Sequence, residues 1–170
     1  MYVDADFSGM WHREYSELCK CALSRTGCII TYCGCPIHWA SKLQSEIALS
    51  TMESKYIALS KASQELLPLC CLVTEFHKHG LFSTPLSHPF STTHTSTLEA
   101  TTIYEDNASC VVLAHSEGTK VCTKHISLKW HRFKDHIKSG EHSVVKIDSN
   151  LSWADIFTKP LCKTKHESLC

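Results

Sequence analysis

The sequence lacks several features that would assign it to a common functional class. Seventeen basic and seventeen acidic side chains give a formal net charge of zero, which excludes a strongly basic nucleic-acid clamp; any such binding must depend on a local patch. No apolar run reaches the roughly 18 residues that cross a bilayer. Residues 1–4 also lack the basic and apolar regions of a secretory signal. We therefore expect a cytoplasmic or nuclear protein that is neither secreted nor membrane-bound.

Motifs of several enzyme and metal-site classes are missing as well. There is no Gly-x-Ser-x-Gly, which makes a serine hydrolase a poor candidate. The eleven cysteines never form a Cys-x-x-Cys pair, so the best zinc alternative is limited to Cys33, Cys35 and His38. An odd number of cysteines without a secretory signal also argues against a disulfide framework. We interpret most of these thiols as reduced, small hydrophobic side chains.

Alternating and β-branched patterns, separated by turn residues, predict five strands: Tyr2–Phe7, Thr26–Tyr32, Ile37–Ala40, Thr101–Tyr104 and Ser143–Ile147. Gly34-Cys35-Pro36 is predicted to form the turn of a hairpin, and residues 10–23 and 83–102 are expected to be loops.

Helical spacing begins at Thr51, and Pro68 is expected to kink or divide that helix before a second piece, Leu69–His79, which Gly80 ends. Further helices are predicted at Asn107–His115, at Lys124–Ser139 and from Asp155 onward. The element order predicts an α/β fold, a mixed central sheet of about five strands flanked by helices.

Three aspartates occupy places where such a fold gathers polar groups. Asp4 and Asp106 follow or end predicted strands, and Asp155 begins the last predicted helix. Any one of them alone is more often a cap or a solvated turn residue. Carboxylates from separate segments that converge, however, are the ligands that hard divalent cations prefer.

Several short runs accompany these aspartates through most of the chain. They are Asp4-Ala5-Asp6-Phe7-Ser8-Gly9, Ser24-Arg25-Thr26-Gly27, residues 34–44, Ile47-Ala48-Leu49-Ser50-Thr51, Glu105-Asp106-Asn107, Thr123-Lys124-His125-Ile126 and residues 154–161. In this order they resemble the ribonuclease H domain of Ty1/copia-type retrotransposon Pol polyproteins. The resemblance covers residues 2–161, so we predict a ribonuclease H-like domain at 1–161 and a C-terminal tail at 162–170.

The resemblance implies two-metal hydrolysis of the RNA strand of RNA–DNA hybrids. Asp4, Asp106 and Asp155 would bind two Mg²⁺ or Mn²⁺ ions, about 3.5–4 Å apart, which activate a water and stabilise the leaving oxygen. The implied partners are the hybrid and other segments of the polyprotein, with no obligate small molecule. Because the first predicted strand begins at Tyr2, we expect a fragment or a relic reading frame, a degenerate copy of the element.

One position departs from the family in a way that bears on catalysis. Where the family has Ser-Thr-x-Glu-Ala-Glu-Tyr-Ile-Ala-Leu, this chain has Lys55 at the second glutamate, which we identify as the metal-binding one, and Glu53 at the first. Residues two apart on a helix point about 200° away from each other, so only one of them faces the site. If position 55 faces it, catalysis is impaired; in the alternative register Glu53 is the ligand and the site is intact.

A hybrid would be held through its phosphates and 2′-hydroxyls. The candidate nucleic-acid-binding residues are Arg25, Lys42, Gln44, Lys124, His125, Lys129, His131, Arg132 and Lys134. Three functions stay open at this stage: a hybrid-cleaving nuclease, a catalytically silent nucleic-acid-binding module, and a non-functional retroelement relic.

Overall fold

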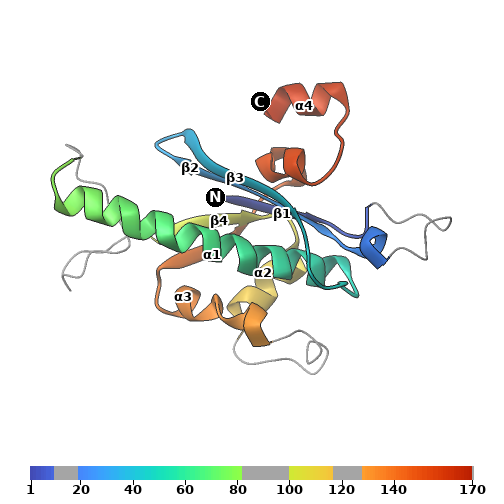
Figure 1. Cartoon of the computed structure of the whole chain (residues 1–170), viewed down its shortest axis with the longest axis horizontal. Helices are drawn as coiled ribbons and strands as arrows, with labels where there is room; N and C mark the ends of the chain where they lie inside the picture. The colour runs from blue at the N-terminus through green and yellow to red at the C-terminus, as the bar shows by residue number, and fades with distance from the viewer. Residues whose placement is uncertain (10–18, 82–99, 117–127, 170) are drawn as a thin grey trace.

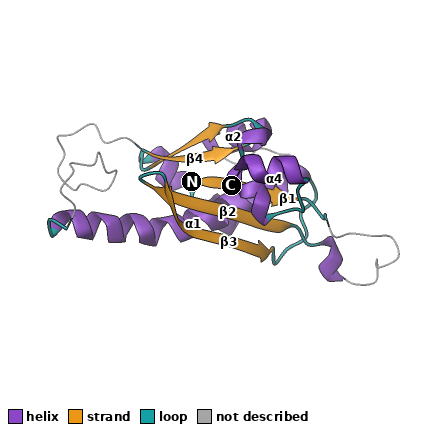
Figure 2. Ribbon diagram, turned by 90° about the horizontal axis from the view of Figure 1, so that it is seen from above, coloured by secondary structure: helices purple, strands orange, loops and turns teal. Residues whose placement is uncertain are grey.

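A computed structural model describes residues 1–9, 19–81, 100–116 and 128–169. Its centre is a five-stranded mixed sheet in the order β3-β2-β1-β4-β5. The strands are β1 (Tyr2–Asp6), β2 (Arg25–Tyr32), β3 (Cys35–Leu43), β4 (Thr101–Glu105) and β5 (His142–Lys146). The first three pair antiparallel, whereas β4 is parallel to both β1 and β5. The predicted fold class is therefore confirmed (Figures 1 and 2).

Helices cover both faces of the sheet. The long helix α1 (Thr51–Lys78) packs on β1 and β2 and contacts α2 (Ala108–His115), which in turn contacts β5 and α3 (Lys134–Lys138). The 3₁₀ helix η6 (Trp153–Phe157), followed by α4 (Lys163–Leu169), covers β1 and β2 from the opposite side. In Figure 1 the sheet lies between the red segment that ends in α4 and the orange helix α3. The helix α4 falls in the segment that we expected to be a tail.

Alternation along β1 places its side chains in two different environments. Val3 and Ala5 belong to the apolar core with Tyr56, Ile57 and Leu59 of α1. Tyr2 points to the other face, where its ring stacks on Trp153 of η6 with centroids 4.8 Å apart. Asp4 shares the face of Tyr2, since side chains two apart lie on the same side of a strand. Burial of β1 on both faces thus encloses a carboxylate.

Gly27 allows η6 to lie close to the sheet. A Cβ atom at this position would lie 2.6 Å from Cγ2 of Thr158 and 2.8 Å from the carbonyl oxygen of Ala154. Only glycine leaves room for that approach. Because Gly27 pairs with Asp4 across β1 and β2, the close contact also brings the η6 segment next to Asp4.

The predicted division of the first helix at Pro68 is wrong. The helix α1 runs without interruption through 28 residues with Pro68 inside it. A proline removes one backbone hydrogen bond, but the buried side chains on either side, Leu66 and Cys70, keep the helix on the core. In Figure 2 its C-terminal turns project beyond the strands.

Other predicted boundaries shift. The hairpin is confirmed, but its turn is Cys33-Gly34, both with positive φ, and β3 already begins at Cys35. The predicted helix 124–139 is instead a 3₁₀ turn, η4 (Leu128–His131), followed by the short α3; residues before 128 lie outside the described chain. Asp155 lies within η6 rather than at the start of an α-helix. In the predicted loop at 10–23, Cys19–Ala22 form a 3₁₀ turn, η2.

Candidate functional site

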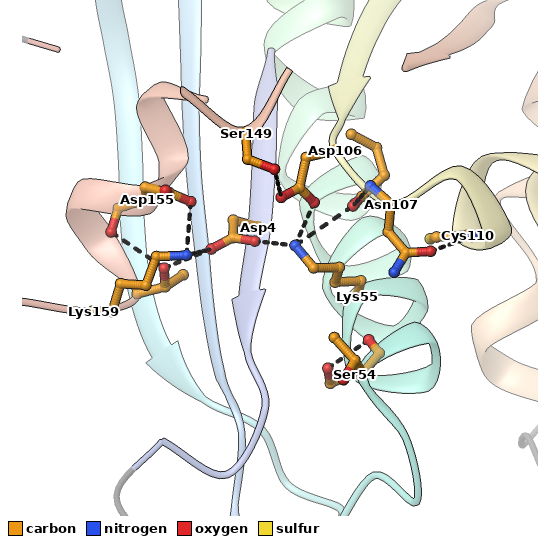
Figure 3. A network of polar contacts seen from close by, with 12 residues as sticks. Asp4, Ser54, Lys55, Asp106, Asn107, Cys110, Ser149, Asp155 and Lys159 are labelled. Atoms are coloured by element: carbon orange, nitrogen blue, oxygen red, sulfur yellow. Dashed lines mark hydrogen bonds and ion pairs between the residues drawn. The ribbon is translucent and has the colours of Figure 1, made fainter. Parts of the chain in front are cut away.

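The sheet brings Asp4 and Asp106 side by side. Parallel strands β1 and β4 pair at Tyr2 and Tyr104, and each aspartate follows its paired tyrosine by two residues. Asp155 reaches the same place from η6, which packs on β1 and β2. Asp4 and Asp155 have no exposed surface. The three aspartates that the sequence indicated therefore gather from three separate segments (Figure 3).

Lys55 lies among them. It projects from the first turns of α1, and its Nζ donates hydrogen bonds to Oδ1 of Asp4 and to Oδ1 of Asp106. The same Nζ is 3.9 Å from Oε1 of Glu105. Figure 3 shows the ammonium group between the Asp4 and Asp106 carboxylates. With only 7% of the residue exposed, this positive charge is part of the interior rather than a surface counterion.

Two further lysines neutralise the other side of the cluster. Nζ of Lys159 lies 3.2 Å from Oδ1 of Asp155 and 3.7 Å from Oδ2 of Asp4. Lys165, on α4, donates to Oδ2 of Asp155 at 2.5 Å. Thus the lysine ammoniums at 55, 159 and 165 surround the carboxylates at 4, 105, 106 and 155.

Asp4 and Lys55 each stabilise the charged form of the other. Burial alone would raise the pKa of the Asp4 carboxyl, but Lys55, the Thr158 hydroxyl and Lys159 outweigh burial and lower it to about 2. Burial likewise opposes the charge on Lys55, yet Asp4, Glu105 and Asp106 raise its pKa above the ordinary value. Burial also raises the pKa of Asp106, but the hydrogen bond and the charge of Lys55, together with the hydrogen bond from Ser149, outweigh burial and lower that pKa. At neutral pH the centre is an ion-paired network.

Glu105 belongs to the same cluster, although the site residues predicted from the sequence do not include it. It has no exposed surface, its Oε1 accepts from the backbone N–H of Asn107 at 3.1 Å, and its Oε2 has no partner in the described part of the chain. Burial raises its pKa well above the ordinary value, so the carboxyl takes up a proton readily. A signal was present: Glu105 shares the inward face of β4 with buried Ile103 at two-residue spacing.

Glu53 caps the start of α1. Its Oε2 accepts from the backbone N–H of Leu49 at 2.7 Å, and its own N–H donates to the Ser50 hydroxyl at 3.1 Å. This arrangement is a variant of the capping box at the start of α1, in which the Glu53 carboxylate accepts from Leu49 rather than from Ser50 itself. Because the carboxylate is used at the helix end, Glu53 does not reach the three aspartates, whereas Lys55 does.

The oxygens that a divalent cation would need are already engaged. Both oxygens of Asp4 and of Asp106 accept hydrogen bonds, from Lys55 and Thr158 for Asp4 and from Lys55 and Ser149 for Asp106. Oδ2 of Asp155 accepts from Lys165, whereas its Oδ1 has only the ion pair with Lys159 and, like Oε2 of Glu105, no hydrogen bond within the described residues. Within the described ranges, no group of three or more histidine, cysteine, aspartate or glutamate side chains is arranged to hold a metal ion, at Cys33, Cys35 and His38 or elsewhere. The residues present do not fit a divalent metal.

The predicted nucleic-acid-binding residues separate into three groups. Arg25, Lys42 and Arg132 remain available as surface cations, although Arg25 also donates to Ser41 at 3.2 Å and Lys42 pairs with Glu65 at 3.2 Å. Gln44 is instead buried, and its amide nitrogen donates to Thr26 Oγ1 and to the Ser54 carbonyl oxygen, so its role is structural.

Two other predicted nucleic-acid-binding side chains also form contacts inside the protein. Lys134 is buried and donates to the Ser116 carbonyl oxygen at 3.2 Å, and Nδ1 of His131 lies 2.7 Å from the Tyr56 hydroxyl. Lys124, His125 and the side chain of Lys129 lie outside the described part of the chain.

No protein-family model matches the chain. The chain is 29% identical over 169 residues to the retrovirus-related Pol polyprotein from transposon TNT 1-94 of Nicotiana tabacum, covering 99% of this chain and 11% of that protein. It is 30% identical over 167 residues to the corresponding polyprotein from transposon RE2 of Arabidopsis thaliana, covering 98% of this chain and 10% of that protein. The chain thus spans about a tenth of the length of these curated relatives.

Among solved structures, LC11-RNase H1, isolated from compost by a metagenomic approach, superimposes with a TM-score of 0.55 at 15% identity, covering 99% of this chain and 96% of that one. The fold is therefore that of a ribonuclease H. Together with the sequence relatives, this identifies the chain as a ribonuclease H-like domain homologous to a segment of copia-type retrotransposon Pol polyproteins. No helix in the described residues is long and apolar enough to cross a membrane.

Proposed function

We propose that this ribonuclease H-like domain is catalytically silent, or nearly so, toward RNA–DNA hybrids, because the Lys55 ammonium takes the place of a catalytic metal ion. The observation that supports the proposal is the pair of hydrogen bonds from Lys55 Nζ to Asp4 and Asp106. Hydrolysis by the two-metal route needs carboxylates that are free to bind cations. Here a fixed monovalent cation neutralises them, and it has neither the charge nor the open coordination positions that would activate a water.

Electrostatics oppose the simultaneous presence of Lys55 and a divalent ion. Two unit charges 4 Å apart interact with about 4 kcal/mol at an effective dielectric constant near 20, and a divalent ion doubles that repulsion. The repulsion would have to be met by the same Asp4 and Asp106 oxygens that Lys55 already engages. Displacement of the side chain is unfavourable too, since Lys55 would leave a buried network in which its charge is stabilised.

The nucleic-acid partner and the polyprotein context remain part of the proposal. Arg25 begins β2 and pairs with Asp6, two residues after Asp4, and Lys42 pairs with Thr26 near the end of β3. Such surface cations would hold a hybrid weakly, in a salt-dependent way, even without cleavage. The other segments of a Pol polyprotein, in a cytoplasmic or nuclear setting, are the expected neighbours of this domain.

The test is cleavage of an RNA–DNA hybrid with Mg²⁺ or Mn²⁺ by the unchanged protein and by Lys55→Glu. We expect a rise of several orders of magnitude in the variant, since each step of about 1.4 kcal/mol in the barrier is tenfold in rate. Lys55→Glu combined with Asp106→Asn is the matched control and should return to background. Equal metal-dependent cleavage by the unchanged protein and Lys55→Glu would refute the proposal. Hybrid binding as a function of salt then separates a silent binding module from a relic, which would bind no hybrid.

A further inference from the structure

A cavity of about 570 Å³ lies away from the carboxylate cluster, between the middle of α1 and the segment that joins η4 to α3. One wall is the α1 surface from Ser60 to Cys71, and the other consists of Arg132, Phe133 and His136. The volume is within the range of small-molecule sites, about 300–1,000 Å³. None of the residues of the carboxylate cluster lines it.

The cavity is lined by polar groups that lack hydrogen-bond partners within the described residues. Ser60 is 1% exposed, and its hydroxyl has no partner in the described part of the chain. Ser63, one turn further on, donates to the Leu59 carbonyl oxygen at 2.9 Å, so the same helix satisfies a neighbouring serine but not this one. Pro68 has no N–H and cannot donate to the carbonyl of Gln64, which also lines the cavity. Buried polar groups without partners are rare in native proteins and require an explanation.

The rim of the cavity is positively charged. Arg132 is exposed, and none of the described acidic side chains pairs with its guanidinium. His136 pairs through Nδ1 with Glu141 at 2.6 Å, which leaves Nε2 for another contact. No aspartate or glutamate is among the described residues that line the cavity. A planar guanidinium in this setting is suited to bidentate binding of a phosphate group.

The remaining lining is apolar. Leu67 and Pro68 from α1 face the cavity together with Phe133. A flat hydrophobic body would be held between these side chains, while the Ser60 hydroxyl and the Gln64 amide supply donors and acceptors for heteroatoms at its edge. A fatty chain would leave these polar groups unpaired, and inorganic phosphate would leave the apolar surface uncovered.

We propose that this cavity binds a nucleoside monophosphate unit, with the phosphate on Arg132 and the base against Leu67, Pro68 and Phe133. The unit is either a free mononucleotide or the phosphorylated end of a nucleic-acid strand, since both present the same chemistry. This binding site does not depend on the proposed role of Lys55, so the two proposals can be tested separately.

The test is a titration of the full chain with AMP, monitored by two-dimensional NMR of the backbone amides. We expect saturable shifts at the amides of α1 and of residues 132–136, with adenosine and inorganic phosphate each binding at least about tenfold more weakly. Arg132→Ala should weaken AMP binding about tenfold, because a charge-assisted hydrogen bond is lost. Lys138→Ala, an equal charge change on α3 outside the cavity, should leave binding unchanged.

Ser60→Ala distinguishes a binding role from a structural one. The hydroxyl has no partner within the described chain, so the variant should keep or raise the melting temperature while AMP binding falls severalfold. A 5′-phosphorylated oligonucleotide that shifts the same amides identifies a strand end as the ligand, and binding of AMP alone identifies a free nucleotide. Absence of saturable shifts with both ligands, or binding by Arg132→Ala equal to that of the unchanged protein, would overturn the proposal.

Discussion

Replacing Lys55 by glutamine removes one buried positive charge and leaves the surrounding carboxylates in place. In the unchanged protein that charge bonds to Asp4 and Asp106 and lies 3.9 Å from Glu105. Removing one partner of a buried ion pair costs about 3–5 kcal/mol, since the remaining charge is left buried without compensation. We expect Lys55→Gln to lose a similar amount of unfolding free energy at neutral pH in the presence of a chelator, with proton uptake by Glu105 limiting the loss.

The same variant should acquire metal-dependent stability. Without the ammonium, Asp4, Glu105 and Asp106 become a set of oxygen ligands, which hard cations prefer. Mg²⁺ at about a hundred times its dissociation constant would restore about 2.7 kcal/mol. The assay is urea unfolding followed by circular dichroism, with chelator and with saturating Mg²⁺. If Lys55→Gln is as stable as the unchanged protein in chelator, or if Mg²⁺ stabilises both proteins equally, the reasoning about Lys55 is refuted.

Three further perturbations test separate parts of the structure. Gly27→Ala would place a Cβ 2.6 Å from Thr158 Cγ2, so we expect a loss of about 1–3 kcal/mol in urea unfolding; unchanged stability would contradict the close packing of η6. Glu53→Gln should cost no more than about 1 kcal/mol, the scale of a helix cap, and should leave the metal response of Lys55→Glu unchanged. Acid unfolding should report on Asp4, whose pKa falls from 3.8 to about 2 on folding. The ionised Asp4 carboxylate should contribute about 2 kcal/mol to the free energy of unfolding above about pH 4, and this contribution should be lost as the pH falls through about 2. An unfolding free energy that does not change over this pH range would contradict the ion pair.

Much of the fold follows from local patterns in the sequence. The five strands are short β-branched or aromatic runs next to turn residues, and Cys33-Gly34 places the hairpin turn where positive φ is needed. Pro68 was misjudged because its local cost is visible in the sequence, whereas the packing of α1 on β1 and β2 that outweighs it is not.

The sequence singles out Asp4, Asp106, Asp155 and Lys55 as members of the site, but not Glu105, Lys159 or Lys165. Asp4 and Asp106 follow from their places on neighbouring strands, and Asp155 from its motif. Lys165 lies within the segment 162–170 that is predicted to be a tail, and only the turn from η6 into α4 brings it to Asp155. For Gln44 the motif predicts a surface contact with nucleic acid, but the side chain is buried and joins the end of β3 to α1 through its hydrogen bond to the Ser54 carbonyl oxygen.

A binding titration with Mn²⁺ decides the claim that the Lys55 ammonium substitutes for a metal ion. Electron paramagnetic resonance of free Mn²⁺ counts the ions bound by the unchanged protein and by Lys55→Glu at neutral pH. We expect the unchanged protein to leave Mn²⁺ free at concentrations at which Lys55→Glu binds it at the cluster of Asp4, Asp106 and Asp155, with Asp106→Asn abolishing that binding in the variant. Binding of Mn²⁺ by the unchanged protein with the same stoichiometry and affinity as by Lys55→Glu would contradict the claim.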